Sequence, residues 1–429
     1  MIYLDYASLT PIDPRVLKVM GEYSKPQYAN PSSWYKQGVA AKKALDAGRK
    51  GVADFLHAHA DEIIFTSGGT EANNLALRGV KGRHLIISEI EHSSIRETAF
   101  VLEKNGVEVT RIGVDEKGIV RLDELKKAIK PETFLVSIMM VNNETGAVQP
   151  IREIAKIIRQ ARARFSEKID GQVVVGAAYP LFHTDAAQAA LYEDLNVDQL
   201  GVDLLTLDGS KVYGPRGMGA LYVRRKILNT EPPAIEPIIY GGGQEKGLRS
   251  GTENLPSIMG FAKALEIIAA KAGKDREKES ERIFQLKDYF VTELLKIRRD
   301  IRINSGFSGK SGGGTQTPVS LAKSDEKVRH FSNMTKRDTP ATSLVSSVAP
   351  HILNISIPGI DNEFLLFQLD AAGIACSTKS SCLRDEDESY VLKAMGADSK
   401  NSLRFSFGRW TKKGDITIVI KKIRDILSK

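Results

Sequence analysis

The stretch "EIIFTSGGTEANNLALRGV", residues 62–80, holds the three parts of an α/β unit in direct succession. Its first six residues are mostly β-branched or aromatic, which is typical of a short buried strand. Gly68 and Gly69 follow as a turn, and after Thr70 the apolar residues return at three- and four-residue intervals, as on one face of a helix. A strand that passes through a glycine turn into a helix favours a parallel sheet covered by helices.

The same alternation continues along the chain on both sides of this stretch. The further predicted strands are "HLIISE", "EVTRIGV", "FLVSIMMV", "VVVGAA", "LLTL" and "GALYV". Segments with helical spacing lie between them, among them "SSIRETAFVLEKNG", "DELKKAIK" and "IREIAKIIRQARARF". The fold class that this pattern predicts is α/β with a mostly parallel sheet.

The C-terminal part has a different pattern. A long helical region at about 255–297 leads to the strands "HILNISIP" and "SLRFSFG" and the helices "NEFLLFQLDAAG" and "DITIVIKKIRDIL", which predict a smaller α+β domain. We expect a large domain at 15–262 and a small domain made of 1–14 and 263–429. Residues 304–343 are rich in Gly, Ser, Thr and Lys, and we expect them to form a mobile surface insertion.

Composition excludes several function classes. The chain has 429 residues, of which 42% are hydrophobic and 27% charged, and it lacks a signal-peptide pattern and any apolar run approaching about 18 residues, so we expect a cytoplasmic protein with no membrane contact. The net charge of +8 is spread along helices that also carry Asp and Glu, which argues against nucleic-acid binding. Cys376 and Cys382 fit neither a zinc nor a C-x-x-C spacing, so we expect a reducing compartment and no metal.

The residues that follow the predicted strands carry the chemistry, because ligands of such sheets bind beyond the carboxyl ends of the strands. Gly69 and Thr70 lie where free amides at a helix start hold a phosphate, with a plain helix cap as the alternative. His92 follows "HLIISE" and either stacks on an aromatic cofactor or has a structural role. Asn143 follows "FLVSIMMV", where a simple turn is the alternative.

Two further strand ends add a carboxylate and an amine. Asp185 follows "LFHT", with Gln188 beside it, and either pairs with a pyridinium nitrogen or caps the next segment. Lys211 follows "LLTL" and precedes the turn "GPRGMG". A partly buried amine beside small residues favours Schiff-base chemistry with a carbonyl cofactor such as pyridoxal phosphate, and a surface charge is the alternative. The phosphate-loop pattern G-x-x-x-x-G-K-[ST] is absent, which argues against a nucleotide site.

The ordered motifs resemble those of the cysteine desulfurases, fold-type-I, class V aminotransferase-like enzymes that use pyridoxal phosphate. The resemblance runs nearly end to end, through "IYLDYASLTPIDPRV", "YANPSS", "TSGGTEANN", "VNNETGAVQPI", "HTDAAQA", "SKVYGPRGMGALYVRR", "GGGQEKGLRSGTEN", "SYVLKAMG" and "LRFSFGRWT". It implies a homodimer whose subunits each have a large sheet domain and a smaller C-terminal domain.

The resemblance also assigns roles around the cofactor. It implies that Lys211 binds the cofactor covalently, that His92 stacks on its ring and that Asp185 pairs with the ring nitrogen. The other contacts that it implies are Gln188 and Asn143 near the ring oxygen, and Thr70, Ser210 and the neighbouring subunit's Thr252 at the phosphate. For the substrate it implies Arg404 at the carboxylate, assisted by Asn30, with Asn143 nearby.

The family's nucleophile is a cysteine on a mobile loop before the "SYVL" helix, and Cys382 stands at that position. Cys376 is interpreted as a small buried hydrophobe at a strand end. The reaction so implied converts L-cysteine to L-alanine: Lys211 is the base at the α-carbon, and the Cys382 thiolate takes the sulfur as a persulfide. Acceptor proteins then receive it for iron–sulfur cluster assembly or tRNA thiolation.

Three features depart from the family pattern. Asp208 stands where the family has a small hydroxyl residue near the phosphate, and its charge would repel a phosphate that it faced. We expect it instead to cap the following turn or to face a cation. Ser210 replaces a histidine, and Lys379 and Ser381 replace small residues before Cys382. The alternatives are therefore a selenocysteine lyase or other class V enzyme, and a catalytically weakened scaffold of sulfur-transfer partners.

Overall fold

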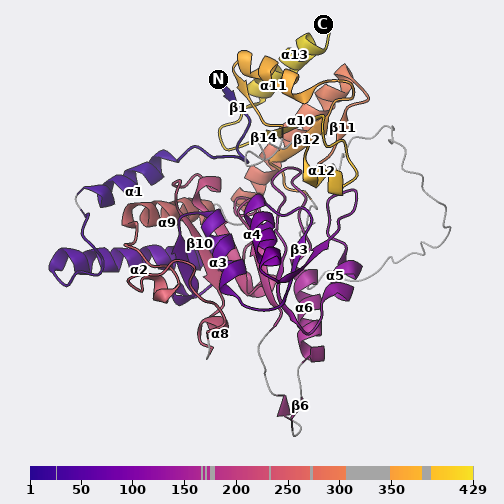
Figure 1. Ribbon diagram of the computed structural model, residues 1–429. Coiled ribbons are helices and arrows are strands. Elements are labelled where there is room, and N and C mark those ends of the chain that lie inside the picture. The colour runs from indigo at the N-terminus through magenta and orange to yellow at the C-terminus, as the bar shows by residue number, and fades with distance from the viewer. Residues whose placement is uncertain are drawn as a thin grey trace, which may run out of the picture.

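A mixed sheet lies at the centre of the larger part of the molecule (Figure 1). The computed structural model describes residues 1–25, 27–165, 168–169, 172–173, 179–230, 233–270, 274–305, 348–378 and 388–428. Within these ranges the sheet has seven strands in the order β2, β10, β9, β8, β5, β3, β4. The bounds are β2 Ile63–Thr66, β10 Gly219–Val223, β9 Leu204–Asp208, β8 Leu181–Asp185, β5 Thr133–Ser137, β3 His84–Ser88 and β4 Glu108–Ile112. β10 is antiparallel to both neighbours and the other pairs are parallel, which confirms the predicted fold class.

Both faces of the sheet are covered by helices (Figure 1). Successive side chains of a strand point to opposite faces, so Ile63 and Phe65 of β2 pack in one apolar cluster while Ile64 packs in another. The first cluster includes side chains of α2, α6 and α9, and the second includes side chains of α3 and α4. Burial on both faces explains why strands such as β2, β3 and β5 are mostly apolar in the sequence.

The helices around the sheet begin and end where local sequence signals place them. Gly68 has a φ of +146°, which an L side chain rarely adopts, and the chain turns there from β2 into α3. In α6 the buried residues Ile151, Ile154, Ala155 and Ile158 follow the three- and four-residue helical spacing. The bounds are α1 Pro14–Ser24, α2 Lys36–Leu56, α3 Gly69–Gly79, α4 Ser93–Lys104, α5 Leu122–Ala128, α6 Ile151–Phe165, α7 Val197–Leu200, α8 Arg225–Leu228 and α9 Leu255–Ala269. Three short 3-10 segments are η1 Ala60–Glu62, η2 Gly209–Lys211 and η3 Glu245–Gly247.

A smaller α+β part packs around an apolar cluster of its own. Its antiparallel sheet has the order β11, β12, β14, and a parallel pair joins the N-terminal β1 to β13. Both chain termini lie in this part (Figure 1). The bounds are β1 Ile2–Tyr3, α10 Lys274–Ile297, β11 Arg302–Ile303, β12 Ile352–Ser356, α11 Asn362–Ala371, β13 Ile374–Ala375, α12 Tyr390–Ala394, β14 Ser402–Ser406 and α13 Lys413–Leu427. The short pair β6 Lys168–Ile169 and β7 Gln172–Val173 lies apart from both sheets.

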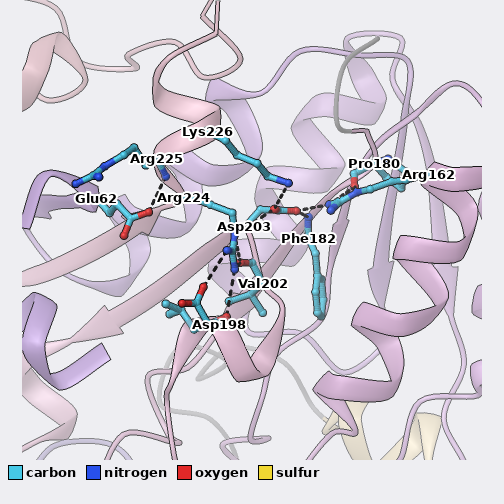
Figure 2. Close-up of polar contacts among 11 residues, drawn as sticks. Glu62, Arg162, Pro180, Phe182, Asp198, Val202, Asp203, Arg224, Arg225 and Lys226 are labelled. Atoms are coloured by element: carbon cyan, nitrogen blue, oxygen red, sulfur yellow. Dashed lines mark hydrogen bonds and ion pairs between the residues drawn. The ribbon is translucent and has the colours of Figure 1, made fainter. Parts of the chain in front are cut away.

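A buried carboxylate holds the amino-terminal ends of β8 and β9 (Figure 2). Asp203 is 1% exposed and forms ion pairs with Arg162, Arg224 and Lys226, which come from α6, from the end of β10 and from α8. Its Oδ2 also accepts a hydrogen bond from the Phe182 amide at 3.0 Å. These contacts tie two strands and two helices together at the end of the sheet opposite the carboxyl ends of the parallel strands.

Several predictions concern residues that the structure describes only in part. The insertion at 304–343 lies, beyond Asn304 and Ser305, outside the described residues, and so does most of the predicted strand "VVVGAA". The boundary between the two expected domains stays a prediction. Within the described ranges, no helix is long and apolar enough to cross a membrane.

Candidate active site

Most of the predicted site residues converge on one cavity of about 190 Å³. The cavity lies at the carboxyl ends of β3, β5, β8 and β9, where ligands bind in open parallel sheets. The predicted residues that line it are Gly69, Thr70, His92, Asn143, Asp185, Gln188, Asp208, Lys211 and Arg404. Ala7, Ser8, Asn73, Ser94, Met139, Val141 and Ala187 complete the lining.

The turn that carries Lys211 is held by the N-terminal segment. Thr10 donates two hydrogen bonds to the Ser210 carbonyl, from its amide at 2.9 Å and its hydroxyl at 2.8 Å. The Thr10 hydroxyl also accepts a hydrogen bond from the amide of Tyr213, whose φ is +60°. The Lys211 amine donates to the Ser8 carbonyl at 2.5 Å. The N-terminal segment therefore positions the amine, whereas Ser210 contributes to its own turn and does not line the cavity.

His92 has a structural role, because it caps α4, and it also lines the cavity, so stacking on a cofactor stays a prediction. Its Nδ1 accepts a hydrogen bond from the Ser94 amide at 3.2 Å, which places the proton of a neutral ring on Nε2. The Asn73 amide group donates to Ser94 Oγ at 2.8 Å and to Asp185 Oδ2 at 2.7 Å. Asn73 therefore connects the histidine cap to the carboxylate expected at the ring nitrogen. In the sequence, only the position of Asn73 one helical turn after Thr70 indicated that it connects these residues.

Asp208 caps the turn that follows it, as expected. Its Oδ1 accepts a hydrogen bond from the Ser210 amide at 2.7 Å, and its Oδ2 accepts one from the Gly69 amide at 3.0 Å. The carboxylate thus lies at the first turn of α3, beside Gly69 and Thr70, where the phosphate was expected. An anion that binds there meets a negative charge already present.

Arg404 is 1% exposed and comes from β14 into the same cavity. It donates to the Asn143 carbonyl at 2.9 Å, to Asp5 Oδ1 at 2.8 Å and to Ser8 Oγ at 2.6 Å. Arg404 Nε and Asn143 Oδ1 are buried without a hydrogen-bond partner among the described residues. A buried donor and a buried acceptor in one cavity indicate a polar ligand that would satisfy them.

Gln188 is oriented by two contacts behind the cavity wall. Its amide group donates to the Ala7 carbonyl at 2.7 Å, and its Oε1 lies 3.5 Å from Nε2 of His351. The His351 ring stacks on Tyr192 with centroids 4.8 Å apart, and burial lowers its pKa to about 3. A neutral ring therefore faces Gln188 Oε1, and the Gln188 amide group points to Ala7.

Two predicted residues lie away from this subunit's cavity. Asn30 is exposed in the segment between α1 and α2, and its side chain accepts a hydrogen bond from the Ser32 amide at 2.8 Å. Thr252 is exposed in the segment that leads to α9. The resemblance assigned Thr252 to a neighbouring subunit's site, so its absence from this cavity agrees with that assignment without testing it.

The two cysteines differ in what the structure describes. Cys376 directly follows β13, is half-buried and packs against the apolar cluster of the smaller part, and desolvation raises the pKa of its thiol to about 12. A raised pKa favours the protonated thiol at neutral pH, in keeping with a structural role, although the side chain is less buried than interpreted from the sequence. Cys382, Lys379 and Ser381 lie outside the described residues.

The class-V aminotransferase family model matches residues 2–306. The cysteine desulfurase IscS of Dictyoglomus turgidum is 35% identical over 439 aligned residues, which cover 100% of this chain and 95% of the relative. This chain belongs to the cysteine desulfurase family. The mitochondrial cysteine desulfurase of Candida albicans, another member, is 36% identical over 99% of this chain and 76% of its own.

Solved structures agree with this assignment. A NifS-like protein superposes with a TM-score of 0.80 at 29% identity and covers 100% of this chain and 99% of its own. SspA, solved in complex with cysteine, has a TM-score of 0.70 at 30% identity over 95% of this chain and 99% of its own. The relatives of this cysteine desulfurase include mitochondrial and mitosomal proteins, so the cytoplasmic location stays a prediction.

Cysteine desulfurases depend on pyridoxal phosphate, and the cavity fits that cofactor in most of its donor set. Lys211 would supply an amine for its aldehyde, Asp185 a carboxylate for its ring nitrogen, and the first turn of α3 amides for its phosphate. Asn143 Oδ1 and Arg404 Nε, which have no partner among the described residues, would add an acceptor and a donor for a substrate. The charge of Asp208, beside the first turn of α3, would oppose the cofactor's phosphate.

Proposed function

We propose that this cysteine desulfurase binds pyridoxal phosphate through Lys211 and passes the sulfur of L-cysteine to Cys382. The observation that carries the proposal is the convergence of Lys211, His92, Asp185 and Arg404 on one cavity at the carboxyl ends of the parallel strands. These side chains come from segments up to about 300 residues apart, so their meeting in one place supports a common chemical task.

The residues of the cavity have separate roles in the proposed reaction. Arg404 binds the substrate carboxylate with its planar guanidinium, and its buried Nε donor gains a partner in doing so. When bound, pyridoxal phosphate supplies an electron sink for the substrate α-carbon. With its amine released, Lys211 would take the α-proton at its Nζ. His92, whose Nδ1 is engaged by the Ser94 amide, presents the Nε2 proton.

Cys382 completes the reaction in the proposal. Its thiolate attacks the substrate sulfur, the S–S bond forms as the C–S bond breaks, and the carbon fragment gains protons and leaves as L-alanine. Acceptor proteins for iron–sulfur cluster assembly or tRNA thiolation then take up the persulfide sulfur. Cys376 is unsuited to this role because burial holds its thiol in the protonated form.

The active unit in the proposal is a homodimer in which Thr252 reaches the partner's phosphate site. The exposed side of α1, α2 and the nearby loops supports this, since Trp34 is 97% exposed, Tyr28 82% and Tyr240 79%. Large aromatic side chains are enriched at protein interfaces and are rarely left in water in such a group. Thr252 is exposed as well, which suits a residue that acts in another subunit.

Sodium borohydride treatment of the protein loaded with pyridoxal phosphate tests the cofactor assignment. A stable cofactor adduct should appear at Lys211 by peptide mass spectrometry and be absent from Lys211→Ala. A persulfide formed from L-cysteine should be found on Cys382 and be lost in Cys382→Ser, whereas Cys376→Ser, the matched control, should keep it. An adduct on another lysine, or a persulfide that survives Cys382→Ser, would overturn the assignment.

Mixed dimers of Lys211→Ala and Thr252→Ala subunits test the subunit arrangement. If Thr252 acts in the partner, one of the two sites in such a dimer has both Lys211 and a partner threonine, and it should bind the cofactor as the wild type does. If Thr252 acts in its own subunit, no site has both groups. Borohydride fixation at limiting cofactor concentration distinguishes the two results, because only one subunit carries Lys211.

A further inference from the structure

The loop at residues 240–252 holds an unfavourable backbone conformation. Glu245 and Lys246, adjacent and not glycine, have φ values of +48° and +60°, in the left-handed region that side chains disfavour. Gly241, Gly243 and Gly247 have positive φ values in the same loop. Such a conformation persists only when surrounding contacts hold it, and it is found most often at functional sites.

The Glu245 side chain supplies those contacts. It is 2% exposed, and both of its oxygens accept hydrogen bonds at 2.6 Å from the guanidinium of Arg49 on α2. Its Oε2 also accepts from the Phe65 amide at 2.8 Å, and Arg49 donates to the Ile63 carbonyl at 2.7 Å. Because β2 is an edge strand, the Phe65 amide and the Ile63 carbonyl are not used by a neighbouring strand on that side. One carboxylate thus fastens the loop to α2 and to the sheet edge.

The rest of the loop closes on itself up to the residue before Thr252. Gln244 Oε1 accepts a hydrogen bond from the Gly251 amide at 2.9 Å, and the Gly243 amide donates to Ser250 Oγ at 3.3 Å. The position of Gly251 is therefore set by residues next to Glu245. Thr252 follows Gly251 directly and is exposed.

We propose that Glu245 is a positioning residue for the cofactor site of the partner subunit. Through Arg49 and the edge of β2 it holds the strained loop that presents Thr252, so it acts across the interface without touching the cofactor. This inference rests on the proposed function, in which Thr252 faces the partner's phosphate. The competing explanation is an effect within the same subunit, through the Arg249–Glu71 ion pair at 2.9 Å beside Thr70.

Mixed dimers distinguish the two explanations. In a dimer of one Lys211→Ala subunit and one Glu245→Gln subunit, the only Lys211 lies in the Glu245→Gln chain and faces an unaltered partner loop. The measurement is borohydride-fixed cofactor on that Lys211 as a function of pyridoxal phosphate concentration. We expect the Glu245→Gln homodimer to need about tenfold more pyridoxal phosphate than the wild type for fixation of half of its Lys211, because one hydrogen bond to a charged group is lost. The mixed dimer should need the same concentration as the wild type.

A mixed dimer that binds as weakly as the Glu245→Gln homodimer would overturn the inference, and so would a homodimer that binds as the wild type does. Glu236→Gln, which removes an exposed carboxylate 3.7 Å from Lys81, is the matched control and should change neither value. Should Glu245→Gln fail to fold, Arg49→Lys, which breaks the same two-pronged contact, replaces it in the same dimers. The inference then predicts weaker cofactor binding in the Arg49→Lys homodimer and wild-type binding in the mixed dimer. If a Lys211→Ala subunit restores cofactor binding to a Thr252→Ala subunit but not to a Glu245→Gln subunit, the proposed function stands and only this inference is contradicted.

Discussion

The Asp208 carboxylate lies 3.0 Å from the Gly69 amide and occupies a hydrogen-bond donor at the amino end of α3. A phosphate at that helix end competes with this carboxylate and is repelled by its charge. We expect Asp208→Ser, which keeps a hydroxyl for the turn, to tighten binding of a phosphate ligand by about tenfold or more, since unit charges near 4 Å repel by roughly 4 kcal/mol at an effective dielectric near 20.

Calorimetric titration with pyridoxine 5′-phosphate measures this effect without covalent chemistry, because that compound lacks the aldehyde. Asp208→Asn should tighten binding as well, since it removes the charge and keeps the shape. Asp425→Asn, which removes an exposed charge from α13, is the control and should leave the affinity unchanged. Equal affinities for wild type and Asp208→Ser would show that the carboxylate and the phosphate do not share the helix end.

Arg404→Lys should raise the KM for L-cysteine by roughly tenfold to a hundredfold, because a lysine amine cannot form the planar two-pronged contact of a guanidinium with a carboxylate. The cofactor adduct on Lys211 should form as in the wild type, because Arg404 is not among the residues proposed to hold the cofactor. Arg302→Lys, an exposed change on β11 of the same small sheet, is the matched control. Steady-state alanine production over a range of cysteine concentrations gives the result, and an unchanged KM would remove Arg404 from the substrate site.

Asp203→Asn should destabilise the fold by about 3 kcal/mol, because it removes the buried negative charge with which Arg162, Arg224 and Lys226 all form ion pairs (Figure 2). Asp198 offers a matched control, since it pairs with the same Arg224 but is 75% exposed. Asp198→Asn should change stability by less than about 1 kcal/mol. Urea unfolding of the two variants checks this difference, and equal effects would show that burial of Asp203 is unimportant.

Glu91→Gln should change how stability depends on pH. Glu91 is fully buried beside His92, and burial raises the pKa of its carboxyl to about 8. Between the pKa of the unfolded chain, about 4.3, and that value, the folded state holds a proton that the unfolded state has lost, so stability falls as pH rises. The glutamine cannot titrate and removes this loss, which amounts to about 1.4 kcal/mol per pH unit.

The difference between wild type and Glu91→Gln is the quantity to measure, because all other titrating groups are common to both. Between about pH 5 and pH 7, the unfolding free energy of the variant minus that of the wild type should increase as pH rises. A constant difference across that range would mean that Glu91 is ionised in the folded protein.

Local sequence was enough to predict the fold class and the strand ends at which the candidate site lies. Runs such as Ile63–Thr66 and Leu204–Asp208 are mostly apolar because both faces of their strands are covered, and the parallel order brings the carboxyl ends of such strands to one edge. The resemblance then named the residues at those ends, and the structure brings most of them to one cavity. Their chemical roles stay predictions.

The sequence alone determined which residues end the strands, since strand ends follow from short-range patterns of apolar residues and turns. Only the tertiary structure decided which of them share contacts. Arg404 meets Asp5 across 399 positions, and Glu245 meets Arg49 across 196. Asn73 reaches Asp185 across 112 positions, between α3 and β8. No local pattern marks such pairs, because a hydrogen bond depends on the position of two side chains in space, and folding sets that position through packing of the whole chain.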